Sequence, residues 1–312
     1  MKLLLRLLGV YICCSLLAPA MTFAAPLTYN LQPKQIAENT WVLQGKLEDF
    51  TMHNGGNIVN TAFIVTDDGV IVIDTGPSYR YGREMRQAIE KLTDKPIKHV
   101  FITHSHPDHF LGNQAFTDAT IWALPETGRQ IAQSGNAFAE NMYRLVGDWM
   151  RDTESTMPNK VLKQEVLKFG GHHFSFLTFT GHTGADLVIM DHTTGVLFTS
   201  DMVFYQRALT TPHTPGLQTW LAELKQLELT SFKLLVPGHG PVVDDGRAYQ
   251  QMADYLTWLD ATLTSAAERG LSMTEVIELP IDPRFAGIAL TQREFIRTVA
   301  HLYPSYEEAA FE

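Results

Sequence analysis

Four metal-binding side chains lie within six positions of the segment THSHPDHFLGN: His104, His106, Asp108 and His109. Imidazole nitrogens and carboxylate oxygens both bind zinc, at about 2.0–2.2 Å. Pro107 disfavours a strand or a helix interior here, so we expect a tight loop on which the side chains converge. A catalytic zinc ion usually takes about three protein ligands. Either some of the four do not bind metal directly, or the site holds two metals.

Further candidate ligands lie downstream, at His182 in TGHTGAD, Asp201 in LFTSDMVF and His239 in VPGHGPV. Each alone would be read as an ordinary loop or turn residue. Together with the histidine cluster they indicate a metal site made of histidine and carboxylate. The two cysteines, Cys13 and Cys14, lie in the apolar N-terminal stretch, so we expect no cysteine ligand, no thiolate nucleophile and no disulfide in the mature chain.

The reactive residues must be positioned by strands and helices that alternate along the chain. Hydrophobic patterning predicts strands over 40–45, 57–66, 69–74, 97–102, 119–123, 161–169, 173–179, 187–191, 196–199 and 233–236, and helices over 81–92, 125–149 and 217–229. Asp74, His104, Asp201 and His239 each follow a predicted strand, where open α/β sheets place ligand sites.

This order predicts an α/β fold with two halves, each with a sheet that needs a helical cover on one side. A four-layer αββα sandwich in a single domain satisfies that requirement. Residues 246–312 are predicted to form a mainly helical C-terminal part, with Tyr249, Met252, Leu256 and Leu259 on one stripe.

The first 24 residues are typical of a secretory signal peptide. Lys2 and Arg6 precede an apolar stretch over 7–17, and small residues lead to Ala24. We expect cleavage there, which leaves a hydrolase domain over 25–312 in the periplasm or secreted, with no stable membrane insertion. An uncleaved anchor is the alternative.

Charge limits the class of partner. The net charge of the chain is −10 and becomes −12 without Lys2 and Arg6. Nucleic-acid binding needs a basic face for phosphate contacts, so we expect no nucleic acid and a small-molecule substrate.

The motif His104–His109, followed by His182, Asp201 and His239, resembles the metallo-β-lactamase superfamily, and so does VIVIDTGPS at 70–78. The resemblance covers nearly the whole mature chain and implies two Zn²⁺ per chain, with iron or manganese as alternatives. It implies a first metal site of His104, His106 and His182, a second of Asp108, His109 and His239, and Asp201 as the bridge. Asp108 and Asp201 would be the catalytic carboxylates beside a metal-bound hydroxide, and Asp74 would support a ligand histidine.

β-Lactamases proper carry cysteine or serine where this chain has Asp201, whereas glyoxalase II and lactonases carry aspartate. The resemblance therefore implies an exported dinuclear zinc hydrolase that cleaves a small ester, thioester, lactone or related bond, rather than an antibiotic-hydrolysing enzyme. The segments 57–78, 103–116, 201–207, 236–242 and 301–304 resemble exported metallohydrolases associated with quinoprotein dehydrogenase systems, which implies a functional link with such a dehydrogenase.

Two other functions stay open. One is a mononuclear iron dioxygenase of the persulfide dioxygenase kind, and the other is a non-catalytic metal-binding accessory of a quinoprotein dehydrogenase. The roles of His213, in a Thr-Pro-His-Thr-Pro loop, and of the loop His53–Asn57 also stay open.

Overall fold

The structure is a computed structural model that describes residues 27–311. The predicted signal peptide, residues 1–24, lies outside the described residues. A seven-stranded sheet comes first, in the spatial order β1 to β7. Its strands are β1 (Lys34–Ala37), β2 (Thr40–Leu43), β3 (Thr61–Val65), β4 (Val70–Ile73), β5 (Ile97–Phe101), β6 (Thr120–Ala123) and β7 (Lys160–Val161).

A five-stranded sheet follows, in the spatial order β12-β11-β10-β9-β8. Its strands are β8 (Val166–Phe169), β9 (His172–Phe179), β10 (Asp186–Asp191), β11 (Val196–Phe204) and β12 (Leu234–His239). β8 to β11 pair antiparallel, whereas β12 lies parallel to β11. The two sheets pack face to face, because one core cluster contains Ile64 and Ile71 of the first sheet together with Phe198 and Val236 of the second.

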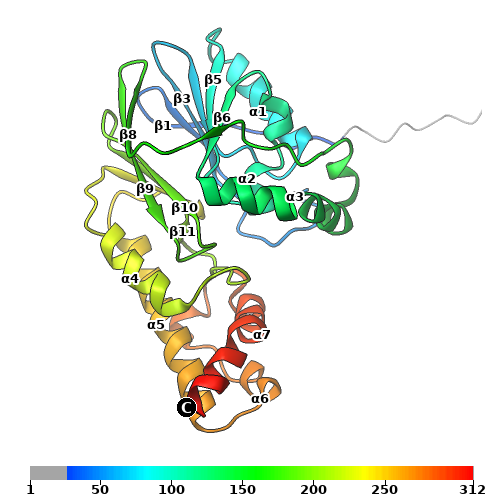
Figure 1. Cartoon of the computed structure of the whole chain (residues 1–312), viewed down its shortest axis with the longest axis vertical. Helices are drawn as coiled ribbons and strands as arrows, with labels where there is room; N and C mark the ends of the chain where they lie inside the picture. The colour runs from blue at the N-terminus through cyan, green and yellow to red at the C-terminus, as the bar shows by residue number, and fades with distance from the viewer. Residues whose placement is uncertain (1–26, 312) are drawn as a thin grey trace, which may run out of the picture.

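Helices cover the outer face of each sheet (Figure 1). The helices are α1 (Tyr79–Glu90), α2 (Pro107–Phe110), α3 (Pro125–Val146), α4 (Leu217–Leu227), α5 (Arg247–Glu268), α6 (Met273–Ile277) and α7 (Thr291–Ala310). Met85 of α1 packs with Val72 and Val100 of the first sheet, and Trp220 of α4 packs with Leu197 of the second. The predicted four-layer αββα sandwich in a single domain is confirmed.

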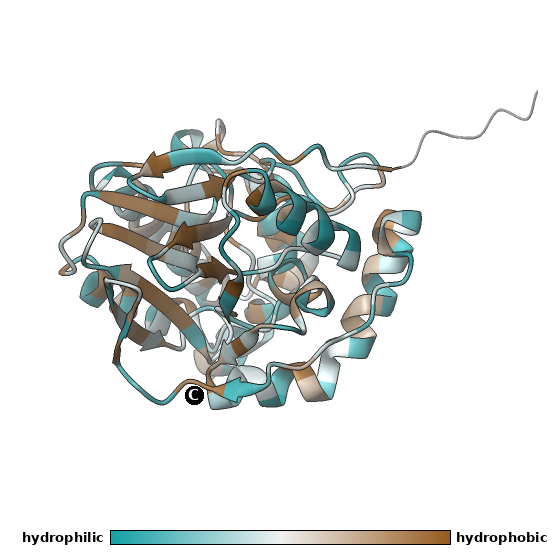
Figure 2. Ribbon diagram, turned by 90° about the horizontal axis from the view of Figure 1, so that it is seen from above, coloured by the Kyte–Doolittle hydropathy of each residue, from teal (hydrophilic) through white to brown (hydrophobic). Residues whose placement is uncertain are grey.

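Hydropathy follows this layering. Figure 2 shows hydrophobic residues concentrated in the strands, whereas the helices carry hydrophobic and hydrophilic residues in alternation. In α1 the buried residues are Tyr81, Gly82, Met85, Ala88 and Ile89, the spacing of one helical face. Within residues 27–311, no helix combines the length and apolar character needed to cross a membrane.

Several predicted boundaries were wrong. The single strand expected over 161–169 is two strands, because the chain passes from the first sheet (β7) to the second (β8) between them. Strand β1 was not anticipated; its burial pattern is exposed to half-buried and gives no alternation to read. Strands β11 and β12 run further than expected, to Phe204 and His239, because their parallel pairing continues past the sequence's hydrophobic runs.

Candidate metal centre

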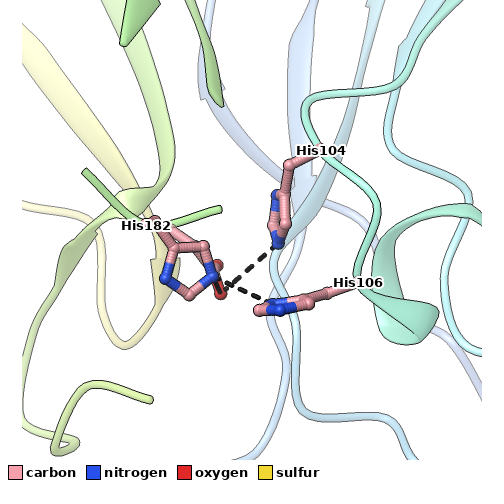
Figure 3. Close-up of side chains that lie close together, drawn as sticks. His104, His106 and His182 are labelled. Carbon is pink, nitrogen blue, oxygen red and sulfur yellow. Dashed lines mark hydrogen bonds and ion pairs between the residues drawn. The ribbon is translucent and has the colours of Figure 1, made fainter. Parts of the chain in front are cut away.

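The first group of candidate ligands consists of His104, His106, His182 and Asp201, whose nearest ligand atoms all lie within 4.8 Å of one another. His182 Nε2 is 2.9 Å from His106 Nδ1 and 3.2 Å from Asp201 Oδ2. His104 Nε2 is 3.8 Å from the same carboxylate oxygen. Figure 3 shows the three histidines pointing toward one another, with His182 opposite His104 and His106.

The second group consists of Asp108, His109 and His239, again within 4.8 Å of one another. His239 Nε2 is 3.5 Å from Asp108 Oδ2. Asp201 faces this group with its other oxygen: Oδ1 is 3.2 Å from His109 Nε2 and 3.4 Å from His239 Nε2. The Asp201 carboxylate thus lies between the two groups, one oxygen toward each.

Both sheets contribute. The loop after β5 carries His104 and His106, and the one-turn helix α2 carries Asp108 and His109, with Pro107 at its first turn. We expected a loop without helix here, and that detail was wrong: a proline is well tolerated at the start of a helix. The second sheet supplies His182, after β9, and two residues inside strands rather than after them, Asp201 in β11 and His239 in β12.

All but one of the histidine nitrogens that point away from the cluster have a partner; the exception is His182 Nδ1, which is buried without one among the described residues. His109 Nδ1 lies 2.7 Å from Asp74 Oδ2 and His239 Nδ1 lies 2.8 Å from the carbonyl oxygen of Ile58. A donor N–H at Nδ1 leaves a lone pair at Nε2, the atom that faces the cluster. His106 is turned the other way: its Nδ1 faces the cluster and its Nε2 lies 2.8 Å from His213 Nδ1.

Asp74 also reaches a second histidine. Thr103 Oγ1 donates to Asp74 Oδ2 at 2.8 Å and lies 3.1 Å from His104 Nδ1. Ser200 Oγ is 2.7 Å from the same hydroxyl. Asp74 and Ser200 have positive φ angles, 56° and 46°, a conformation uncommon outside glycine and typical of functional sites. Asp74 is therefore bonded directly to His109 and, through Thr103, to His104.

The electrostatics suit a cation. Burial lowers the pKa of His104 and His106 well below the usual value, so both are neutral with a free lone pair. Burial raises the pKa of Asp201, but the adjacent His239 and His109 outweigh this and hold it well below the usual value. Burial lowers the pKa of His109, and the carboxylates of Asp201, Asp74 and Asp108 outweigh that and raise it.

Unpaired buried atoms test whether a metal fits. His104 Nε2, His109 Nε2 and Asp201 Oδ1 are buried without a hydrogen-bond partner. Buried polar atoms normally have a hydrogen-bond partner, and a buried atom without one needs an explanation such as a bound ion. These atoms all face the cluster, and histidine with carboxylate is a donor set that zinc accepts. The residues present fit a metal centre.

A cavity of about 150 Å³ opens beside the cluster. His106, Asp108, Asp201 and His239 form its metal-centre end, and His213 lines it too. The fold thus places His213 at the site, a position that the sequence of its loop did not predict. Of the loop His53–Asn57 no residue lines the cavity; the flanking residues Phe50 and Ile58 do.

Three charged residues that line the cavity were not among the predicted site residues: Asp49, Arg207 and Arg297. Asp49 and Arg297 are 248 positions apart and are joined only by the fold. His172 and Asp191, by contrast, form a buried 2.9 Å pair outside the metal centre.

Curated relatives show what the chain is similar to. It is 23% identical to a linear primary-alkylsulfatase of Pseudomonas sp., over 76% of this chain and 53% of that protein. It is 25% identical to the hydroxyacylglutathione hydrolase GloC of Haemophilus influenzae, over 60% of this chain and 88% of the relative. The chain thus spans about half the length of the alkylsulfatase and most of GloC.

Solved structures share the fold. A metallo-β-lactamase from Pontibacter korlensis superposes with a TM-score of 0.60 at 20% identity, covering 73% of this chain and 99% of that one. The sec-alkylsulfatase Pisa1 from Pseudomonas sp. superposes with a TM-score of 0.63 at 17% identity, covering 88% of this chain and 50% of that one. The family model of the metallo-β-lactamase superfamily matches residues 54–239, from the loop before β3 to the last candidate ligand. The chain belongs to the metallo-β-lactamase superfamily.

Proposed function

We propose that this protein is an exported dinuclear zinc hydrolase that cleaves a small ester, thioester, lactone or related bond. The observation that carries the proposal is the position of Asp201, whose Oδ2 faces the first ligand group and whose Oδ1 faces the second. A carboxylate so placed can bridge two ions. The complete second group, Asp108, His109 and His239, would be superfluous for a single ion.

The chain's own residues have separate tasks. His104, His106 and His182 would hold one zinc ion, and Asp108, His109 and His239 the other, with Asp201 shared. When bound, two zinc ions supply a nucleophile from water near neutral pH and polarise the scissile bond. Asp108 lines the cavity, so its carboxylate is placed to accept a hydrogen bond from the attacking water and orient it. Asp74 and Thr103 fix the rings of His109 and His104.

The relatives support a hydrolase and differ in the bond. Their names specify a sulfate ester for the alkylsulfatase, a hydroxyacyl thiol conjugate for GloC and an acyl-carrier thioester for an atrochrysone carboxyl ACP thioesterase of Cryptosporiopsis sp.. The last is 23% identical over 62% of this chain. The ester and thioester class is common to these names, and the cavity beside the metal centre of this chain suits a small substrate.

Metal analysis and an activity assay test the proposal together. Protein purified without added metal should contain about two zinc ions per chain and should hydrolyse 4-nitrophenyl esters or acyl thioesters, with loss of activity after chelation and recovery with zinc. One iron ion per chain together with oxygen uptake on a persulfide would instead indicate the dioxygenase. Bound metal without turnover on any ester or thioester would indicate the accessory protein.

Export and the link to a quinoprotein dehydrogenase belong to the proposal as predictions. The N-terminal layout of Lys2, Arg6 and the apolar stretch supports export. Co-purification of the exported protein with a quinoprotein dehydrogenase would support the link, and its absence from that fraction would count against it.

A further inference from the structure

Arg207, at the wall of the cavity, is a buried cation with too few partners. Its side chain is 2% exposed. Its Nη1 donates to the carbonyl oxygen of Ala208 at 3.1 Å, its Nη2 is 3.9 Å from Glu294 Oε1, and its Nε has no partner among the described residues. A guanidinium carries several N–H donors in a rigid fork, and a buried charge is costly unless it is paired and hydrogen-bonded. Arg207 is therefore left short of acceptors.

A second arginine reaches the same cavity from the C-terminal helix. Arg297 of α7 lines the cavity together with Arg207, Asp108 and Asp201. Its Nη1 donates to Glu294 Oε1 at 2.9 Å, and its Nη2 donates to Asp49 Oδ2 at 3.3 Å. Two guanidinium groups and the metal-centre carboxylates thus share one small space.

The two cavity arginines share one buried carboxylate, Glu294. Arg297 Nη1 lies 2.9 Å from Glu294 Oε1, whereas Arg207 Nη2 lies 3.9 Å from the same oxygen. Burial raises the pKa of Glu294 despite Arg207 and Arg297 beside it. Glu294 Oε1 is thus closely paired with Arg297 and only distantly with Arg207.

Building on the hydrolase proposed above, we infer that the substrate carries an anionic oxygen group, a carboxylate or a similar oxyanion, that binds Arg207 and Arg297 while its scissile bond lies at the Asp108 and Asp201 end. Arginine is suited to this because its fork matches two oxygens at once. Apolar side chains also line the cavity: Phe50, Ile58, Phe138 and Pro212. They would contact the carbon chain between the anionic group and the scissile bond.

A purely structural task for the arginines explains only part of the arrangement. Asp49 Oδ2 contacts both Arg293 and Arg297, which ties α7 to the loop between β2 and β3. The side chain of Arg293 is 55% exposed and does not line the cavity. Its ion pair with Asp49 therefore serves only to hold α7 against the loop. The tie does not involve Arg207, and it does not give Arg207 Nε an acceptor.

Two esters that differ in one group test the inference on the zinc-loaded, full-length mature protein. Mono-4-nitrophenyl succinate ends in a carboxylate where 4-nitrophenyl butyrate ends in a methyl group, and the leaving group is the same. We expect kcat/KM to favour the succinate ester by about 10–100-fold, the range given by hydrogen bonds to a charged group. A ratio near one in the wild-type protein overturns the inference.

Variants assign any preference to the arginines. Two variants should each bring the succinate-to-butyrate ratio of kcat/KM toward one. The first is Arg297→Gln. The second is the double variant Arg207→Gln with Glu294→Gln, which removes both members of the buried pair and so leaves no lone charge. Arg293→Gln is the matched control, because it removes a charge from the same helix and the same Asp49 contact but none from the cavity; its ratio should stay at the wild-type value. A large ratio that survives Arg297→Gln and the double variant overturns the inference, since the metals alone would then attract the anion.

Equilibrium binding separates this inference from the hydrolase proposal. Propionate, sulfate and phosphate are titrated into the wild-type protein and into Arg297→Gln, and the shift in thermal denaturation midpoint is recorded; the anion with the largest arginine-dependent shift identifies the oxyanion class. If neither ester is hydrolysed, the proposed ester activity is wrong, and an arginine-dependent shift still supports the anion site. If the shifts are equal in both proteins, the anion site is overturned even where both esters are hydrolysed.

Discussion

Asp201 concentrates the chemistry of the site in one side chain. It is 3% exposed and its two oxygens face different ligand groups. Several buried nitrogens converge on it, which is why it stays ionised against the cost of burial. A residue that holds two groups of ligands together has no substitute elsewhere in the cluster.

Asp201→Ala should therefore lose both metal and activity. Removing the carboxylate leaves His109 and His239 without the oxygen at 3.2 and 3.4 Å, and the two ligand groups without their shared member. We expect metal content well below that of the wild type and hydrolysis near background, measured by elemental analysis and ester turnover on the same sample. A variant that retained about two zinc ions and full turnover would show that the two groups do not depend on Asp201.

Asp74→Asn tests the support of the ligand rings. The amide cannot accept from His109 and Thr103 as the carboxylate does, so the rings lose their fixed orientation. Substitution of such a partner costs about 10–100-fold in metal affinity or activity. Competition with a zinc chelator measures the loss.

Asp191→Asn is the matched control for Asp74→Asn. Asp191 is also buried and paired with a histidine, His172 at 2.9 Å, but outside the metal centre. It should reduce the free energy of unfolding by about 1–3 kcal/mol and leave zinc affinity unchanged. Equal zinc affinity in the wild type and Asp74→Asn would show that the hydrogen bonds of Asp74 do not contribute to zinc binding.

At the level of elements, the predicted positions were correct where a local sequence pattern determines the element. The buried strand ending at Asp74 and the loop after β5 were placed correctly, because a continuous apolar run and a dense ligand motif are local signals. The ends of β11 and β12 were missed, because what extends them is pairing: Phe204 lies opposite His239, 35 positions later in the chain. Arg297 was missed for the same reason, since its partner Asp49 is far away in sequence.

The pairing of β11 with β12 leaves no room for a side chain at Gly238, in β12. A Cβ atom on Gly238 would lie 1.9 Å from Asp201 Oδ1 and 2.7 Å from the backbone nitrogen of Asp201. Gly238→Ala should displace the Asp201 carboxylate and thereby lower zinc content and activity, although alanine has the higher intrinsic stability in regular structure.

Gly128→Ala provides the comparison. Gly128 lies in α3 with nothing within 4 Å of an added Cβ. We expect a gain of about 0.5–1 kcal/mol in the free energy of unfolding, with zinc content unchanged. Thermal denaturation and metal analysis of Gly238→Ala and Gly128→Ala test both expectations. Normal zinc content in Gly238→Ala would mean that β11 and β12 can move apart without displacing the Asp201 carboxylate.

At the scale of the whole molecule, the C-terminal helices are part of the same body as the site. The family match ends at residue 239, yet Phe295 and Val299 of α7 belong to the core cluster that contains Leu197 of the second sheet. The sequence predicted a helical part over 246–312, and α5, α6 and α7 occupy most of it. Its composition did not predict that α7 would reach the cavity.

The N-terminal segment leads to a prediction about the mature protein. We expect the native product to begin near Ala25 and to be found outside the cytoplasm, because Lys2, Arg6 and the apolar stretch have the layout of a secretory signal peptide. Mass spectrometry of the protein from fractionated cells checks it. A soluble cytoplasmic product that kept residues 1–24 would refute export.

The candidate ligands come from both sheets: His104, His106, Asp108 and His109 from the side of the first, and His182, Asp201 and His239 from the second. An ion bound there joins two halves of the sandwich, and a ligand that binds only the folded chain stabilises it by about 2.7 kcal/mol at a hundredfold excess over Kd and about 4.1 kcal/mol at a thousandfold excess. Zinc supply would then govern the lifetime of the protein as well as its activity. Under zinc starvation the sandwich should open at the seam between its sheets and become a substrate for proteases, so that the abundance of the protein follows the zinc content of its surroundings; limited proteolysis with and without a chelator measures how closely.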